Sequence, residues 1–127
     1  MLTRDELETL ARHFLDAWNS QDVEAVLACY TTDLVYRDPN TRASVIGSDS
    51  MRRYLTKLFA TWSMTWSLRE AHAFRDSDGA AILWHATFSR TGQKSRVEAD
   101  GMDFIALRGR LAYRNEVYFD RAVLSEV

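Results

Sequence analysis

The hydrophobic period of this chain changes at Trp62. Before this residue, apolar side chains recur at the spacing of about 3.6 residues that marks helices. After it, apolar and polar side chains alternate as they do in strands. Helices followed by a run of strands are typical of α+β domains. We therefore expect one domain over residues 1–127, with three N-terminal helices packed on one face of a curved antiparallel sheet. Such a sheet, covered by helices at one end, leaves a conical pocket for a small molecule.

Capping residues and apolar stripes delimit the first two helices. Thr3 to Glu6 reads as a capping box, which predicts a first helix over about residues 4–19. Asp22 can cap a second helix, whose apolar face extends to Tyr30. The polar run Thr31–Asp33 then ends this second helix.

The rest of the chain divides in the same way. Residues 39–46 form a polar loop, and Gly47 opens a third helix whose apolar stripe reaches Trp62. Four long strands follow, and turn residues separate them at three places: Asp76–Gly79, Thr91–Gly92 and Arg108–Gly109.

Composition excludes several classes of function. The chain has 16 Lys and Arg against 18 Asp and Glu, so it has no broad basic field for nucleic acid. No apolar run approaches the ~20 residues of a membrane span, and the polar N-terminus is unlike a signal peptide. Cys29 is the single cysteine, which fits a reducing cytoplasm. No metal-ligand spacing and no Gly-rich phosphate loop suggests a cofactor, so we expect none.

Asp38 is the first candidate functional residue. It ends a short apolar strand, because Pro39 removes a backbone donor and disfavours helical geometry before it. The strand period of 2 places Asp38 on the same face as Leu34 and Tyr36. This carboxylate is either a turn former that bonds its own loop or an acid/base aimed into the pocket.

Asp103 is the second candidate, because it interrupts an otherwise apolar strand face. A buried carboxylate without partners is costly, so such a group is paired, hydrogen-bonded or protonated. Gly101, two residues earlier on the same face, removes a side chain and could open room for a ligand. Two acids in one apolar pocket could have separated pKa values, one acting as base and the other as neutral donor.

The hairpin at Arg108–Gly109 decides which residues lie beside Asp103. A two-residue loop places these residues of the last strand on the same sheet face as Asp103: Arg114, Glu116 and Tyr118. A three-residue loop with a bulge at Gly109 places the other set there: Tyr113, Asn115 and Val117. The apolar alternation of the last strand favours the second register, with Asn115 as the polar neighbour of Asp103.

Aromatic residues dominate the predicted inward faces. Trp18, Trp62 and Trp84 are expected to point inward, either as plain core or as a stacking wall for a flat ligand. His85 is expected on the outer sheet face, away from chemistry.

At this point the chain resembles a known superfamily. The resemblance lies in the two-helix opening, Gly47 before the third helix and these runs: Trp18-Asn19-Ser20-Gln21-Asp22, Tyr36-Arg37-Asp38-Pro39, Asp103-Phe104 and Asn115-Glu116-Val117-Tyr118-Phe119-Asp120. The chain is similar to nuclear transport factor 2-like domains, which have a cystatin-like α+β cone. Within that superfamily it is similar to SnoaL-like polyketide cyclases and ketosteroid isomerases.

The resemblance implies a chemistry for the two acids. Ketosteroid isomerases use an Asp base before a Pro, which Asp38 matches, and a protonated Asp before an aromatic residue, which Asp103 matches. Their helix-1 tyrosine donor falls at Phe14 here, so half of the oxyanion hole is missing. Two other branches fit less well. Limonene epoxide hydrolases need an Asp-Arg-Asp set, which the matching strand Trp84-His85-Ala86-Thr87 lacks. Scytalone-dehydratase-like members need an Asp at the end of the first helix, where this chain has Asn19.

We therefore expect an enzyme of the SnoaL-like group that acts on an apolar cyclic carbonyl compound, with Asp38 and Asp103 as catalytic residues. The residues expected to bind substrate are Phe14, Trp18, Tyr36, Trp62, Trp84, Asn115 and Tyr118. The alternative is a non-catalytic ligand-binding or dimerisation module. The resemblance also implies a homodimer through the outer sheet face, where these residues lie: Leu83, His85, Met102 and Phe104.

Overall fold

The computed structural model describes residues 1–127 and contains three α-helices, six strands and a terminal 3-10 helix. The helices and strands lie in this order: α1 Arg4–Ser20, α2 Val23–Leu27, β1 Tyr30–Arg37, β2 Val45–Ile46, α3 Ser48–Thr61, β3 Trp62–Ala73, β4 Gly79–Arg90, β5 Arg96–Arg108, β6 Leu111–Tyr118 and η1 Arg121–Glu126. Helices precede the long strands, as the change of period predicts.

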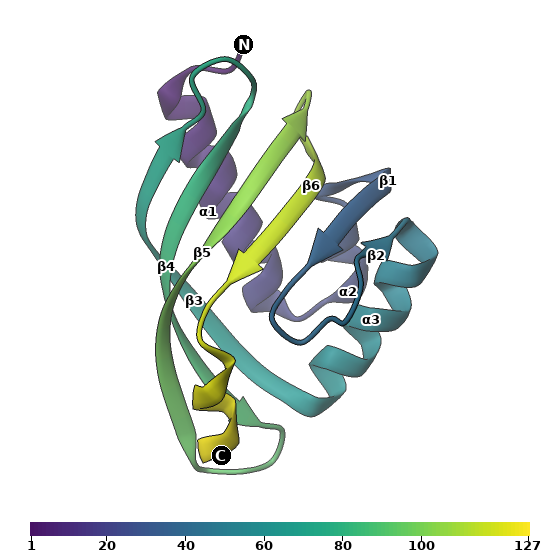
Figure 1. Cartoon of the computed structure of the whole chain (residues 1–127), viewed down its shortest axis with the longest axis vertical. Helices are drawn as coiled ribbons and strands as arrows, with labels where there is room; N and C mark the ends of the chain where they lie inside the picture. The colour runs from purple at the N-terminus through teal and green to yellow at the C-terminus, as the bar shows by residue number, and fades with distance from the viewer.

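The six strands form one sheet in the order β2-β1-β6-β5-β4-β3. Strands β3 to β6 are an antiparallel meander with a strong curve, and α1 lies across one face of it (Figure 1). The sheet is antiparallel, as expected, except at one pair, where β1 runs parallel to β6. Within the meander, β6 would have an unpaired outer edge, and β1 pairs with that edge.

Local signals determine where α1 begins and ends. Thr3 accepts a hydrogen bond from the Glu6 backbone N–H, and Glu6 reaches back to Thr3, so the predicted capping box is present. At the other end, Gln21 adopts a left-handed conformation (φ 50°), which stops the helix. The turn places Gln21 to hold the start of β3: its side chain bonds the backbone of Trp62 and Met64.

Two predicted boundaries were wrong by a few residues. The second helix ends at Leu27, and Tyr30 begins β1, where it pairs with Ala112 of β6. Trp62 is the first residue of β3 and not the last turn of α3. Both aromatics are on the inward side in either conformation, so a hydrophobic stripe alone cannot distinguish helix from strand at these points. The predicted polar loop 39–46 also contains the short edge strand β2.

Side chains on the concave face of the sheet form the core. In β4 the alternation predicted from sequence is complete, since Ile82, Trp84, Ala86 and Phe88 are all buried. The helices cover this face, and η1, near the C-terminus, lies at one end of the cone (Figure 1). None of the helices is both long and apolar enough to span a bilayer.

The expectation that Gly101 opens room for a ligand was wrong. The space beside Gly101 is filled by the ring of Trp84, its partner across the β4–β5 pair. A Cβ at this position would lie 2.7 Å from the Tyr118 carbonyl oxygen and closer still to the Trp84 ring. The glycine therefore admits an indole and not a substrate.

We expect Gly101→Ala to destabilise the protein by about 1–3 kcal/mol, because the added methyl overpacks Trp84 and a fixed carbonyl. Urea unfolding measures this loss. In a Trp84→Phe background the same change should cost less, because the smaller ring vacates part of the space. An equal cost in both backgrounds would mean that Trp84 is not the obstacle.

Candidate active site

An apolar cavity lies on the concave face of the sheet, at the end of the cone that η1 covers. Fifteen residues line it, twelve of them hydrophobic: Phe14, Leu15, Trp18, Tyr36, Asp38, Asn40, Leu58, Trp62, Met64, Trp66, Phe88, Asp103, Val117, Phe119 and Leu124. The two carboxyl groups predicted from sequence thus share one cavity. They reach it from distant segments, the loop after β1 and the middle of β5.

This cavity is narrow, with an interior volume of about 40 Å³. A single water needs about 10–15 Å³ on this measure, and a cavity of about 150 Å³ holds benzene. A ring-sized ligand therefore requires side chains at the mouth to move. Leu58 and Leu124 are there, and both are only partly buried.

A second apolar cavity lies on the other side of Phe14, between α1 and the β5–β6 hairpin. It is roomier, at about 250 Å³, and its lining includes Cys29 and Arg110. It contains no carboxyl group, and burial raises the pKa of the Cys29 thiol, which keeps the thiol protonated. The chemistry of the side chains therefore favours the cavity that holds both acids.

Asp38 is held by four hydrogen-bond donors. Its Oδ1 accepts from the backbone N–H groups of Asn40 (2.8 Å) and Thr41 (3.1 Å), which is a turn-forming arrangement. Its Oδ2 accepts from the hydroxyls of Tyr36 (2.7 Å) and Tyr54. Asp38 therefore forms the turn that the sequence allowed, with one oxygen, and it also lines the cavity.

The two tyrosines stay neutral donors. Burial and then the charge of Asp38 raise the pKa of Tyr36 well above its usual value, and the same two causes raise the pKa of Tyr54. Sequence reasoning missed Tyr54. Its place on the apolar stripe of α3 was visible, but a tyrosine on such a stripe is ordinary core unless its hydroxyl is known to meet an acid.

Asp103 has the opposite environment. It is 5% exposed, and only two donors reach it, Trp84 Nε1 at 2.9 Å from Oδ1 and Asn115 Nδ2 at 3.1 Å from Oδ2. The pKa of Asp103 is raised to about 6, mainly by burial and in smaller part by the charge of Asp38, while the two hydrogen bonds act to lower it. Near neutral pH this carboxyl can therefore hold or release a proton.

Asn115 fixes the position of Asp103 from behind. Its Oδ1 accepts from the buried Tyr30 hydroxyl (2.7 Å), and its Nδ2 also donates to the Phe104 carbonyl (3.2 Å). The Phe104 carbonyl can only accept a hydrogen bond, so it settles that the amide end facing Asp103 is Nδ2. Tyr30 was not anticipated as part of the site, because its hydroxyl meets Asn115 across 85 positions of sequence.

The register of the β5–β6 hairpin is the one that the sequence favoured at the site. Asp103 pairs with Val117, and Ile105 with Asn115. The extra residue lies elsewhere, because the irregularity falls between Ala106 and Leu107, opposite Tyr113, and not at Gly109. Ala112 takes the inward place next to Asn115 as a result, and Tyr113 does not.

The predicted binding residues fall into three groups. Phe14, Trp18, Tyr36 and Trp62 line the cavity, as does Trp66. Trp84 and Asn115 are fully buried behind Asp103, so they position the acid and do not face the cavity.

Tyr118 lies outside the cavity. It is 51% exposed, and its hydroxyl donates to Glu116, which lies on the same outward face of β6. The strand period explains this position, because Val117 occupies the inward place opposite Asp103.

Trp18 Nε1 is a buried donor that has no hydrogen-bond partner of good geometry. It lies near the Tyr30 hydroxyl and acts to lower the pKa of that group, which burial raises. No group of three or more His, Cys, Asp and Glu side chains is placed to hold a metal ion.

Comparison with known proteins places this geometry in a family. The model of the SnoaL-like domain matches residues 11–114. A search of the curated proteins found no match.

Three solved structures share the fold. A ketosteroid isomerase-like protein from Erwinia carotovora atroseptica is 22% identical, with a TM-score of 0.71, over 89% of this chain and 92% of that chain. A proposed polyketide cyclase from Silicibacter sp. TM1040 is 16% identical, with a TM-score of 0.78, over 99% and 97%. The epoxide hydrolase/cyclase-like enzyme SalBIII is 17% identical, with a TM-score of 0.83, over 97% of both chains. These likenesses confirm the cone-shaped α+β fold, and the family match shows that this chain belongs to the SnoaL-like domain family.

Proposed function

We propose that this protein binds an apolar cyclic carbonyl compound and moves a proton at the carbon next to the carbonyl. The reaction would be a cyclisation or an isomerisation. One observation carries the proposal: two carboxyl groups in opposite environments share a cavity that is otherwise almost entirely apolar. Asp38 has four donors around its charge, whereas Asp103 is buried with a pKa of about 6.

The proposed step needs one base and one donor. The Asp38 carboxylate takes the proton from the α-carbon, and the electron pair of the broken C–H bond forms a C=C bond. The carbonyl π electrons then move to oxygen, where the protonated Asp103 donates a hydrogen bond to the new enolate. Return of the proton from Asp38 to another carbon completes an isomerisation. In a ring closure, the enolate carbon attacks a second carbonyl, and the alkoxide that forms takes the proton from Asp38.

The hydrogen bonds of Asp103 leave its proton free for a ligand. Each of its oxygens already accepts one bond from the protein, from Trp84 or from Asn115. The O–H of the neutral acid therefore has no protein acceptor among these partners, and Asp103 lines the cavity. Trp18 Nε1 is a second buried donor that a ligand oxygen could satisfy.

The alternative is a binding module without turnover, and the surroundings of Asp38 favour it. A carboxylate has about four lone-pair sites, and four donors already reach Asp38. It must release a tyrosine hydroxyl before it can accept a proton. A ligand that binds without exchanging its α-proton would support this second candidate.

The test is hydrogen exchange at an α-carbon, because this reaction requires no knowledge of the natural product. We expect the protein to speed the loss of the C1 proton of 2-tetralone in D2O, followed by proton NMR. A rate equal to that of buffer with heat-denatured protein, under conditions where 2-tetralone binds, would overturn the proposal of proton transfer and leave the binding module.

The pH profile of this exchange follows from Asp103. Because the donor must be protonated, we expect the rate to fall about tenfold per pH unit above the pKa of about 6. Asp103→Asn keeps a neutral donor that does not titrate, so its profile should lose this falling limb. A wild-type rate that rises steadily from pH 5 to pH 8 would exclude Asp103 as the essential acid.

A further inference from the structure

The mouth of the active-site cavity opens into a broad groove between α3 and η1. Four residues line both the cavity and the groove: Asn40, Leu58, Trp62 and Leu124. Tyr54, whose hydroxyl bonds Asp38, also lines the groove. The groove therefore offers a ligand a route to the cavity that Asp38 lines.

The groove is positively charged, although the whole chain has a net charge of -2. Three cationic residues line it, Lys57 from α3, Arg90 from β4 and Arg121 from η1, against one acid, Asp120. The Asp120 carboxylate is already engaged, because it accepts from the Ala122 backbone N–H that opens η1 (3.0 Å).

The three cations differ in how they are held. Arg90 lies over the Trp62 ring, with Cζ 4.8 Å from its centroid, and its Nε donates to the main-chain oxygen of Val127 (3.4 Å). Lys57 and Arg121 form no ion pair with any residue of the chain, whereas Arg52, on the same helix as Lys57, pairs with Glu24 and Asp49. Two unpaired charges therefore stand at the entrance of an apolar cavity.

We propose that the ligand of this protein is an amphiphilic acid. Its ring system enters the apolar cavity, and a carboxylate, sulfonate or phosphate group remains in the groove near Lys57 and Arg121, which are called the rim cations below. This inference rests on the proposed function for the position of the ring and adds the charge of the substrate. Rim charges act through water, so their effect is modest and depends on salt.

A matched pair of probes isolates the charge. We expect 2-naphthoate to bind the wild-type protein about three- to tenfold more tightly than the isosteric 2-naphthamide at low salt, as measured by calorimetry. The preference should shrink in 0.5 M NaCl. An NMR titration should shift the Trp62 indole N–H signal, which reports binding at the shared wall of cavity and groove.

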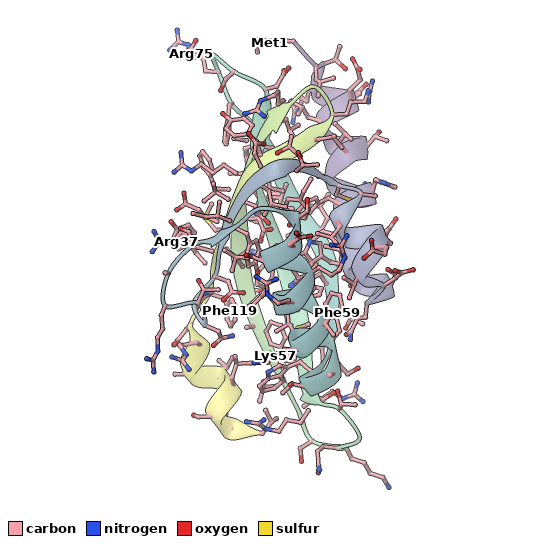
Figure 2. The ribbon with its side chains drawn as sticks, turned by 90° about the vertical axis from the view of Figure 1, so that its right-hand side faces the viewer. Met1, Arg37, Lys57, Phe59, Arg75 and Phe119 are labelled. Atoms are coloured by element: carbon pink, nitrogen blue, oxygen red, sulfur yellow. The ribbon has the colours of Figure 1, made fainter.

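The decisive variant is Lys57→Gln/Arg121→Gln, which should abolish the preference for naphthoate and leave naphthamide binding unchanged. The matched control is Arg4→Gln/Arg75→Gln, which removes the same charge at the other end of the molecule, where Figure 2 shows Arg75 opposite to Lys57. The control should keep the preference.

Each outcome separates this inference from the proposed function. Equal affinities for the two probes, or a preference that survives loss of the rim cations, would overturn the inference and leave proton transfer intact. A rim-dependent preference without any α-proton exchange would support the inference and count against proton transfer. Failure of both probes to bind would count against the apolar ring site on which both depend.

Discussion

Asp38→Asn is expected to lower the rate of α-proton exchange by about 100- to 10,000-fold, which is the usual contribution of a positioned base. The variant should keep its loop, because the Asn side-chain oxygen can still accept from the backbone N–H groups of Asn40 and Thr41. What disappears is the negative charge, and with it the ability to take a proton. NMR exchange of 2-tetralone at fixed pH measures the loss.

The matched control for this change is Asp49→Asn, which removes one carboxylate at the exposed start of α3, outside the cavity. It should exchange 2-tetralone at the wild-type rate. Both variants should bind 2-naphthamide like wild type, which shows that the cavity is intact. If Asp38→Asn retained the wild-type exchange rate, Asp38 would be a structural residue of its loop, and another group would have to serve as base.

The second large effect concerns stability and is independent of any substrate. The pKa of Asp103 is about 6 in the folded chain, against 3.8 for an unperturbed Asp. Between these values the folded state keeps a proton that the unfolded state has lost, so the free energy of unfolding falls as pH rises. This contribution is fully present below pH about 4 and is lost as pH rises through about 6. The difference between these two pKa values corresponds to about 3 kcal/mol of unfolding free energy.

Other carboxylates act in the opposite direction and must be separated from this effect. Several have a pKa lowered by hydrogen bonds or cations, so they add stability that is lost as pH falls: Glu6, Glu24, Asp33, Asp100 and Glu116. The measurement is therefore the difference in unfolding free energy between wild type and Asp103→Asn, from urea titrations at pH 4, 5, 6 and 7. Shared contributions cancel in this difference.

The Asn variant should be the less stable protein at pH 4. Its amide oxygen can accept from either Trp84 or Asn115 but not from both, which leaves one buried donor unpaired at a cost of about 1–3 kcal/mol. The two proteins should converge as pH rises to 7, because only the wild type pays to ionise a buried acid. A difference that stays constant from pH 4 to pH 7 would show that Asp103 has no raised pKa.

The sequence predicted much of the fold because hydrophobic period is a local property. The capping box at Thr3, the alternation of β4 and the turn before Gly79 each depend on neighbours within a few residues. The errors fell where a local pattern has two solutions, as at Tyr30, which is buried, and at Trp62, which is half-buried. An inward-facing aromatic residue fits a helix or a strand at these points. The parallel pairing of β1 with β6 joins segments about 80 residues apart, and no local signal encodes it.

The candidate site divides in the same way. Asp38 and Asp103 could be named from sequence because each is a carboxylate on an apolar face, which is an exception visible along a single strand. Gly101 could not be interpreted correctly, since the atom that fills its space belongs to Trp84 on the neighbouring strand. The roles of Tyr54 and Tyr30 were equally out of reach, because a hydroxyl becomes functional only through its partner.

By itself, the sequence determined an α+β chain with helices first, and two acids facing inward. Both follow from the spacing of apolar residues along one segment at a time. Only the tertiary structure decided that the two acids share a cavity, that one is surrounded by four donors and the other by two, and that the mouth carries unpaired cations. The physical reason is that burial and hydrogen bonding are set by groups brought together from β1, α3, β4, β5 and β6, and these contacts determine how each carboxyl holds its proton.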